Sequence, residues 1–309
     1  MKGRLMHGWF AHFRRRIKHE FRLDISPDKS VGPDIYPLAY CCLKLKRIPM
    51  KPRDVRTTAG FDEELDTYVS KWQLLRDAIE AGDDLFPYSS KRVADWKFND
   101  FLFHSCGISH LHLARSTKGE TGSTLVFGIF TPGNFHALAL GDHHDLYQRS
   151  RILERIGSGA DELGLSLKRA DGKVAWPADG KDFKQWANHK QLGGNLLYPA
   201  QWSVDGRGML LDGHQRGALI RFTLNGVTHT VPVSAYHAYE REGNALDAIE
   251  AELTARHGRM DFRLCIDDER SMYVISWGSD SIVEYPMPHD GLTCSHFAHR
   301  EGCSQFAAD

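Results

Sequence analysis

The sequence predicts an α+β protein in which helices are followed by a small antiparallel sheet, with a second α+β domain after it. Three observations predict this fold class. Residues 61–81 carry apolar side chains at helical spacing, residues 108–140 hold three short apolar runs separated by turn signals, and Asn225-Gly226 joins two further runs. At 309 residues the chain is long enough for more than one domain.

The first segment, residues 1–60, is predicted to be a basic N-terminal arm. It holds fourteen Lys and Arg against five acidic residues, although the net charge of the whole chain is only −1. Trp9, Phe13 and Ile17 recur at helical spacing within it, so a short amphipathic helix is expected. This helix could lie on RNA phosphates or a partner, or pack its aromatic side on the body. Prolines then leave at most a strand over residues 40–48.

The segment 61–157 is predicted to be the first folded domain. One long helix is expected over residues 61–81, with Asp62 in its first turn and Gly82 after its end. A shorter helix is expected to begin at a Ser89 or Ser90 cap and to run toward Phe98. Strands are expected over 108–113, 124–130 and 135–140, and then a helix that ends at 157–159.

The remainder is predicted to comprise a loop-rich connector, residues 158–202, and an α+β accessory domain, residues 203–309. Within the accessory domain the sequence predicts a hairpin of 217–223 with 227–233 across Asn225-Gly226. A helix capped near Asn244 and two strands, 262–266 and 272–277, complete it.

Several function classes are disfavoured by the sequence. No apolar run has the length of a membrane span, and residues 1–16 lack the features of a secretion signal, so a cytoplasmic protein without membrane contact is expected. Six scattered cysteines do not form a disulfide framework, which favours a reducing compartment. We find no phosphate-binding loop, dinucleotide-binding fingerprint or nucleophile elbow.

A group of histidines supplies the main candidate site. Strict alternation along residues 108–113 puts His110 and His112 on one face of a strand. His143, His144 and Tyr147 follow the third predicted strand, so one fold could gather all five side chains. One imidazole could take the proton of a ribose 2′-hydroxyl while another group protonates the leaving 5′-oxygen. Such a ribonuclease would need no metal or other cofactor.

Basic residues could bind the RNA of this predicted site. Those near the histidines in sequence could hold the charged phosphorane, and two more lie in the basic segment. The candidates for RNA contact are Arg115, Lys118, Arg149, Lys46 and Arg47.

Metal binding is the competing interpretation of the same histidines. With Asp145 nearby, the cluster offers enough ligands for zinc, iron or manganese, as in a metal-dependent hydrolase or a cupin-like barrel. Glu120 and His136 lie at poor spacing for a cupin. A structural zinc site is also conceivable in the tail, where four ligands fall within ten residues, although an unstructured tail is the simpler expectation. These ligands are Cys294, His296, His299 and Cys303.

Three short motifs resemble the RelE/YoeB-type bacterial toxins, which are mRNA interferases. Residues 107–113 are similar to the family strand in which two alternating lysines contact the scissile phosphate, and His110 and His112 stand in those places. Residues 124–127 look like the family's Arg-Leu-Val-Tyr strand, with Thr124 where the arginine would be. Residues 141–147 are similar to the closing segment with a basic residue and a late tyrosine. The resemblance is confined to about residues 60–156.

The resemblance implies an endoribonuclease toxin, or an effector of anti-phage defence, that acts on RNA and could act on ribosome-bound mRNA. It also implies a possible antitoxin partner. Because Thr124 replaces the arginine, an alternative is a non-catalytic RNA- or partner-binding regulatory protein with a degenerate toxin-like domain. Whether the protein is an enzyme is therefore left open by the sequence.

Overall fold

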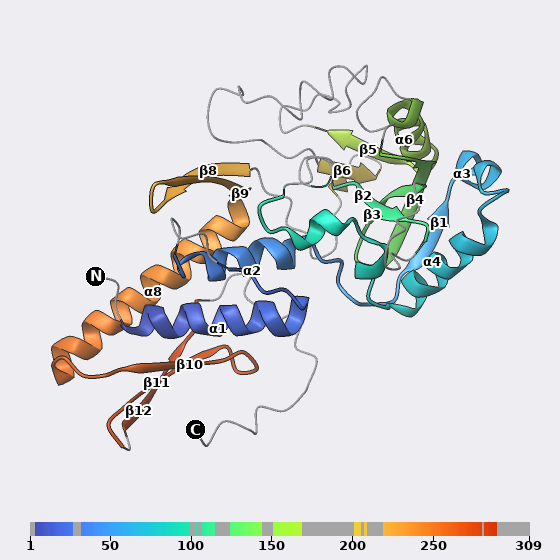
Figure 1. Ribbon diagram of the computed structural model, residues 1–309. Helices are drawn as coiled ribbons and strands as arrows, with labels where there is room; N and C mark the ends of the chain where they lie inside the picture. The colour runs from blue at the N-terminus through green and yellow to red at the C-terminus, as the bar shows by residue number, and fades with distance from the viewer. Residues whose placement is uncertain are drawn as a thin grey trace. The chain divides into compact units, whose positions relative to one another are not determined.

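The computed structural model describes residues 4–26, 32–98, 103, 107–114, 124–143, 151–168, 201–204, 207–208, 219–279 and 281–288. It is a mixed α+β structure, as expected (Figure 1). The chain forms two compact units: unit 1 comprises Met1–Cys41 and Tyr236–Asp309, and unit 2 comprises residues 42–235. This division differs from the four predicted segments, because the two ends of the chain belong to one unit. Among the described helices, none is long and apolar enough to cross a membrane.

Helix α1 (Arg4–Phe21) confirms the predicted amphipathic helix and extends it at both ends. The side chains of Leu5, Trp9, Phe13 and Ile17 are at most 2% exposed, so the apolar face of α1 is part of a core. The helix lies so close to the sheet of unit 1 that a Cβ atom on Gly8 would stand 2.9 Å from Leu264 Cβ. The first residues are therefore not an arm but a central element of unit 1.

Helix α2 (Ile35–Lys46) corrects the prediction of a strand at 40–48. The prolines of this region predict a break in any helix, but Pro37 lies in the first turn of α2, where its missing N–H has no intrahelical partner to lose. The Tyr40 ring packs 4.9 Å from the Phe13 ring, and its hydroxyl donates to Glu20 on α1. Tertiary packing therefore decides the conformation here.

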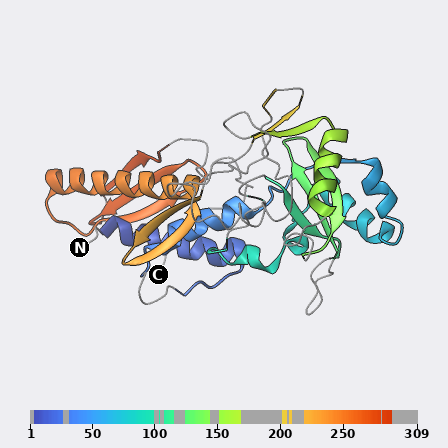
Figure 2. The same cartoon turned by 90° about the horizontal axis from the view of Figure 1, so that it is seen from above.

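The rest of unit 1 is an antiparallel sheet with helix α8 beside it, as Figure 2 shows from above. The two predicted strands are confirmed and a third was missed. The helix predicted from Asn244 begins eleven residues earlier in the structure, at Val233. The elements are α8 (Val233–His257), β10 (Arg263–Asp267), β11 (Met272–Trp277) and β12 (Ser281–Pro286).

Unit 2 is built on a four-stranded sheet of order β1-β4-β3-β2. The three predicted strands are confirmed. Strand β3 pairs antiparallel with β2 on one side and with β4 on the other. Strand β1 was not predicted, since it lies in the segment taken for an arm, and it pairs in parallel with β4. The strands are β1 (Asp54–Thr57), β2 (Ser109–His112), β3 (Leu125–Phe130) and β4 (Asn134–Gly141).

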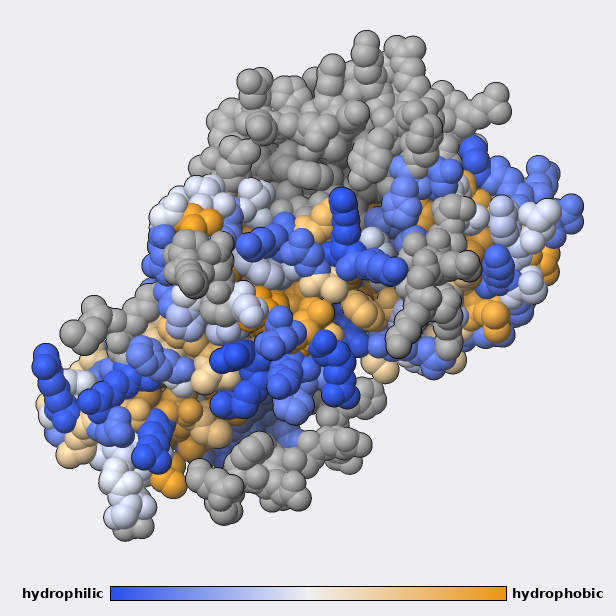
Figure 3. Space-filling view, viewed as in Figure 1, coloured by the Kyte–Doolittle hydropathy of each residue, from blue (hydrophilic) through white to orange (hydrophobic). Residues whose placement is uncertain are grey.

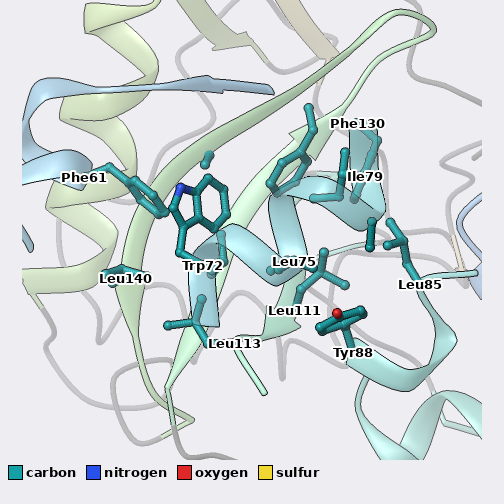
Figure 4. Close-up of a cluster of buried hydrophobic side chains, with 14 of the residues drawn as sticks. Phe61, Trp72, Leu75, Ile79, Leu85, Tyr88, Leu111, Leu113, Phe130 and Leu140 are labelled. Atoms are coloured by element: carbon teal, nitrogen blue, oxygen red, sulfur yellow. The ribbon is translucent and has the colours of Figure 1, made fainter. Parts of the chain in front are cut away.

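Two helices pack on one face of this sheet. The predicted helix over 61–81 is broken into α3 (Ala59–Glu64) and α4 (Val69–Ala81). Thr58 caps α3 by accepting a 3.1 Å hydrogen bond from the N–H of Phe61, and Gly82 ends α4 at φ 76°. Phe61 and Trp72 lie side by side in the core, as Figure 4 shows, with ring centroids 4.9 Å apart.

The second predicted helix is replaced by two short 3₁₀ turns, η1 (Phe86–Tyr88) and η2 (Lys91–Ala94). Its cap is confirmed, because the Ser90 hydroxyl accepts from the N–H of Arg92. Helix α6 (Arg151–Glu162) does not end at 157–159 as predicted. In the structure α6 packs on β4, and the predicted domain boundary falls inside unit 2.

The last described elements of unit 2 are small. The predicted hairpin is confirmed as β8 (Leu219–Leu224) and β9 (Val227–Pro232). Asn225 and Gly226 have φ values of 50° and 82°, as a tight hairpin turn requires. The hairpin belongs to unit 2, so the predicted accessory domain is divided between the units. A further sheet joins β5 (Leu165–Lys168), β6 (Gln201–Val204) and β7 (Arg207–Gly208).

Candidate functional site

Strand β2 presents two histidines on one face of the unit 2 sheet. His110 pairs with Phe127 and His112 pairs with Leu125 in the antiparallel register with β3. Opposed residues of antiparallel strands share a face, so both imidazoles lie on the side of Phe127. The ring of His110 stands 6.3 Å from the ring of Phe127. The predicted alternation of these histidines is therefore observed.

The opposite face of the same strands is hydrophobic core. Leu111 of β2 and Val126 of β3 point into the cluster that contains Trp72 and Leu75 of α4. A one-residue slip of β2 would turn Leu111 out of the core and put His110 and His112 in, at the cost of burying two imidazoles there. The hydrophobic pattern thus fixes the face on which the histidines lie.

His143 completes the site from the end of β4, the strand on the other side of β3 from β2. It follows Gly141, the last residue of β4, which pairs with Leu125 on β3. Two strand spacings, about 10 Å, separate β4 from β2, so the chain after β4 must cross the sheet for His143 to meet the β2 histidines. It does so: the His143 ring centroid lies 5.3 Å from that of His112 and 5.6 Å from that of His110.

The three histidines differ in access to solvent. His112 is only 3% exposed, His110 is half-buried and His143 is exposed. A substrate arriving from solution would meet His143 first and His110 next. His112 lies beneath the surface and contacts the ring of His143.

The structure brings together three of the five predicted catalytic side chains. His144 and Tyr147 follow His143 directly in sequence but lie outside the described residues. The same holds for three of the predicted RNA contacts and for the remaining metal candidates. These residues are Arg115, Lys118, Arg149, Glu120, Asp145, Cys294, His296, His299 and Cys303.

The other two predicted RNA contacts have structural partners. Lys46 is 7% exposed, and its ammonium group donates to the carbonyl oxygens of Asp95 and Trp96 at 2.7 and 3.3 Å. The guanidinium of Arg47 donates to Asp84 at 2.7 Å. Both cations therefore stabilise the fold of unit 2, and we do not assign them to an RNA surface.

His136 is a buried histidine of a different kind. It lies on β4 opposite Arg56 of β1, five residues before Gly141 and so about 17 Å along the strand from the His143 end. Burial, and then the positive charge of Arg56, lower its pKa to about 4. This imidazole is therefore neutral at physiological pH. The sequence indicated His136 only as a metal ligand of a cupin-like barrel.

The described histidines do not form a metal centre. No group of three His, Cys, Asp or Glu side chains within the described ranges is arranged to hold a metal ion. The described part of the site thus consists of three imidazoles, of which His112 is buried, His110 half-buried and His143 exposed. Imidazoles can accept and donate protons near neutral pH, because their unperturbed pKa lies there.

Comparisons with known proteins add no relative. No family model, curated protein or solved structure matches the chain. The functional conclusion therefore depends on the site itself.

Proposed function

We propose that the protein is an endoribonuclease that cleaves RNA without a metal ion, through the histidines of unit 2. The observation that carries this proposal is the meeting of His110, His112 and His143, with ring centroids 5.3 to 5.6 Å apart. They come from two segments separated by thirty residues of sequence. Such a cluster, with the exposed His143 as a member, is where acid–base chemistry is expected.

The proposed reaction is transesterification at a phosphodiester. One neutral imidazole removes the proton of the ribose 2′-hydroxyl, whose oxygen then bonds to phosphorus. The bond from phosphorus to the 5′-oxygen breaks, and a protonated imidazole gives its proton to that oxygen. The products are a 2′,3′-cyclic phosphate and a free 5′-hydroxyl. His143 and His110 are the proposed proton-transferring pair, because His112 has almost no exposure to solvent.

The resemblance to RelE/YoeB-type toxins supports the same reaction class and suggests its setting. Under this proposal the protein is a bacterial growth-arrest toxin or an anti-phage effector, and ribosome-bound mRNA is a candidate substrate. His144 and Tyr147 remain proposed participants on the basis of the sequence alone. The role of an antitoxin partner is proposed on the same basis.

A non-catalytic RNA-binding protein is the second candidate function. Thr124, which stands where the toxin family has an arginine, favours it: a ribonuclease without a cation at that place has lost stabilisation of the cleaved phosphate. A third candidate, metal-dependent hydrolysis, would need ligands beyond the described residues.

The test is cleavage of total bacterial RNA, and of translating ribosomes, by the purified full-length chain with and without EDTA. His143→Ala is the main variant, because an exposed side chain is removed without disturbing the core. His237→Ala, which removes an exposed histidine of α8, is the matched control. Cleavage that resists EDTA, persists in His237→Ala and is lost in His143→Ala supports the proposal. No cleavage by the wild-type chain favours the binding protein, and cleavage lost in EDTA favours the metal-dependent hydrolase.

A further inference from the structure

Helix α1 has two chemically different faces along its whole length. Its apolar side chains, including Trp9 and Phe13, are buried in unit 1. On the opposite side, exposed positions recur every three or four residues, which is the period of a single helix face. The side chains at these positions are Arg4, His7, Ala11, Arg14, Arg15, Lys18 and His19, and Arg22 follows directly.

The C-terminal half of this face is uncompensated positive charge. Arg14, Arg15, Lys18 and Arg22 are all exposed, and none of them forms an ion pair with any residue the structure describes. The guanidinium of Arg14 lies 5.8 Å from the centroid of the Tyr36 ring, a cation–π contact that leaves its charge in place. In Figure 3, hydrophilic side chains gather over α1.

Arg16 shows what a structural cation on the same helix looks like. Its guanidinium pairs with Glu20 and lies 2.7 Å from an Asp268 carboxylate oxygen, and its side chain is only 18% exposed. None of the four exposed cations has such an acidic partner among the residues that the structure describes. Their charges are therefore available to an anion from outside the protein.

A membrane surface does not fit this helix. Helices that bind an anionic bilayer insert an apolar face below the head groups. The apolar residues of α1 are already used, since Leu5, Trp9, Phe13 and Ile17 are at most 2% exposed. What remains is a charged surface without an apolar anchor, which suits a soluble polyanion.

We propose that this face of α1, formed by Arg14, Arg15, Lys18 and Arg22, binds the phosphate backbone of a nucleic acid. Arginine and lysine side chains and phosphate oxygens form the bulk of such contacts, and these contacts carry no base specificity. The surface belongs to unit 1, whereas the histidine site belongs to unit 2, and it stands on its own observations. It holds whether or not the histidines cleave RNA.

The test measures binding rather than cleavage. The affinity of the full-length chain for fluorescently labelled oligouridine and oligothymidine, each thirty nucleotides long, is measured by fluorescence anisotropy at several salt concentrations. The protein carries His143→Ala and is kept in EDTA. The variant Arg15→Gln/Lys18→Gln/Arg22→Gln removes three charges from the face. The matched control, Lys71→Gln/Arg259→Gln/Arg263→Gln, removes three exposed charges elsewhere and changes the net charge equally.

The expected result is weaker binding by the α1 variant alone. Each lost phosphate contact reduces the magnitude of the negative slope of log affinity against log salt by about 0.7, so three lost contacts reduce it by about 2. RNA and DNA should bind alike, because the contacts are to the backbone. Equal losses of affinity in the α1 variant and the control, or an unchanged salt slope in the α1 variant, would overturn the proposal. The proposed ribonuclease activity can fail without affecting this result, since no cleavage is measured.

Discussion

The indole Nε1 of Trp9 donates a 3.0 Å hydrogen bond to a carboxyl oxygen of Glu242, which lies on α8 at the far end of the sequence. Both side chains are buried, Trp9 completely and Glu242 to 95%. The indole is a neutral donor, and the only hydrogen bond that it can donate goes to this carboxyl. An ionised carboxylate is costly in such surroundings. Burial accordingly raises the pKa of Glu242 to about 7.

Glu242 should make unit 1 less stable as the pH rises from about 4.5 to about 7. Its folded-state pKa is raised above the ordinary 4.5, so the folded state holds the proton more tightly than the unfolded state does. The stability it contributes is complete below pH 4.5 and is lost as the pH rises to about 7. A shift of this size corresponds to about 3 kcal/mol.

Glu242→Gln tests this expectation, because glutamine can still accept the Trp9 hydrogen bond but cannot ionise. We expect the variant to be more stable than the wild type at pH 8, and the two to converge at pH 4 and below. Urea denaturation followed by circular dichroism at several pH values measures the difference. Glu269→Gln, which makes the same substitution at an exposed position of unit 1, is the matched control. A constant difference between Glu242→Gln and wild type at all pH values would contradict the prediction.

The same pair of residues shows why the N-terminal segment was mispredicted. The spacing of Trp9, Phe13 and Ile17 correctly predicted a helix, because helical periodicity is a local property. What that helix packs against depends on residues more than two hundred positions away, such as Glu242 and Leu264. An excess of basic residues therefore indicated an arm, although only one face of the helix is free.

His136 should make unit 2 less stable as the pH falls, which is the opposite of the effect of Glu242 on unit 1. Its pKa is lowered to about 4, first by burial and then by Arg56, so the folded state binds a proton less readily than the unfolded state. The stability that it contributes is present above the ordinary pKa of 6.5 and is lost as the pH falls to about 4. The loss amounts to about 3 kcal/mol.

His136→Asn removes this titration while keeping a polar side chain of smaller volume. At pH 7.5 the variant should be somewhat less stable than the wild type, because packing is lost. As the pH falls toward 4, the deficit should shrink or reverse, since only the wild type loses stability by this route. Thermal melts at each pH give the comparison, and parallel curves for the two proteins would disprove the argument.

Two helical glycines are predicted to respond in opposite ways to alanine. A Cβ atom at Gly159 of α6 would stand 2.7 Å from the backbone oxygen of Leu138 on β4. Backbone cannot move aside easily, so Gly159→Ala should destabilise unit 2 by about 1–3 kcal/mol. At Gly60 of α3 nothing lies within 4 Å of the added atom. Gly60→Ala should therefore stabilise, by up to about 1 kcal/mol, through helix propensity.

Denaturation midpoints of these two single variants test the contact between α6 and β4. Equal changes in the two midpoints would show that helix propensity alone determines the effect of each alanine on stability. They would contradict the close contact between Gly159 and Leu138. The sequence had placed the end of the helix at 157–159, because glycines commonly end helices. In the structure Gly159 instead lies within α6, where an added Cβ would meet the backbone of Leu138 on β4.

The histidine site was predictable in part. Alternation along residues 108–113 gave the shared face of His110 and His112, since the period of a strand is a local property. The position of His143 was not given by any pattern, because it depends on the path of the chain across the sheet after Gly141. The spacing of the histidines also could not show that His112 is buried while His143 is exposed. These differences follow from the packing of the strands.

The exposure of the three histidines leads to a prediction about the pH dependence of cleavage. If His110 and His143 exchange protons with the substrate, one must be neutral and the other protonated, so kcat/KM should pass through a maximum near neutral pH. His143→Ala should remove one limb of this profile and lower the rate by about 10²–10⁴, the usual contribution of one acid–base group. His112→Asn should lower the rate less and keep both limbs, because His112 contacts His143 but scarcely reaches solvent. Initial rates on a defined oligoribonucleotide in EDTA, from pH 5 to 9, provide the measurement. A profile that loses both limbs in His112→Asn would instead make the buried histidine a direct participant.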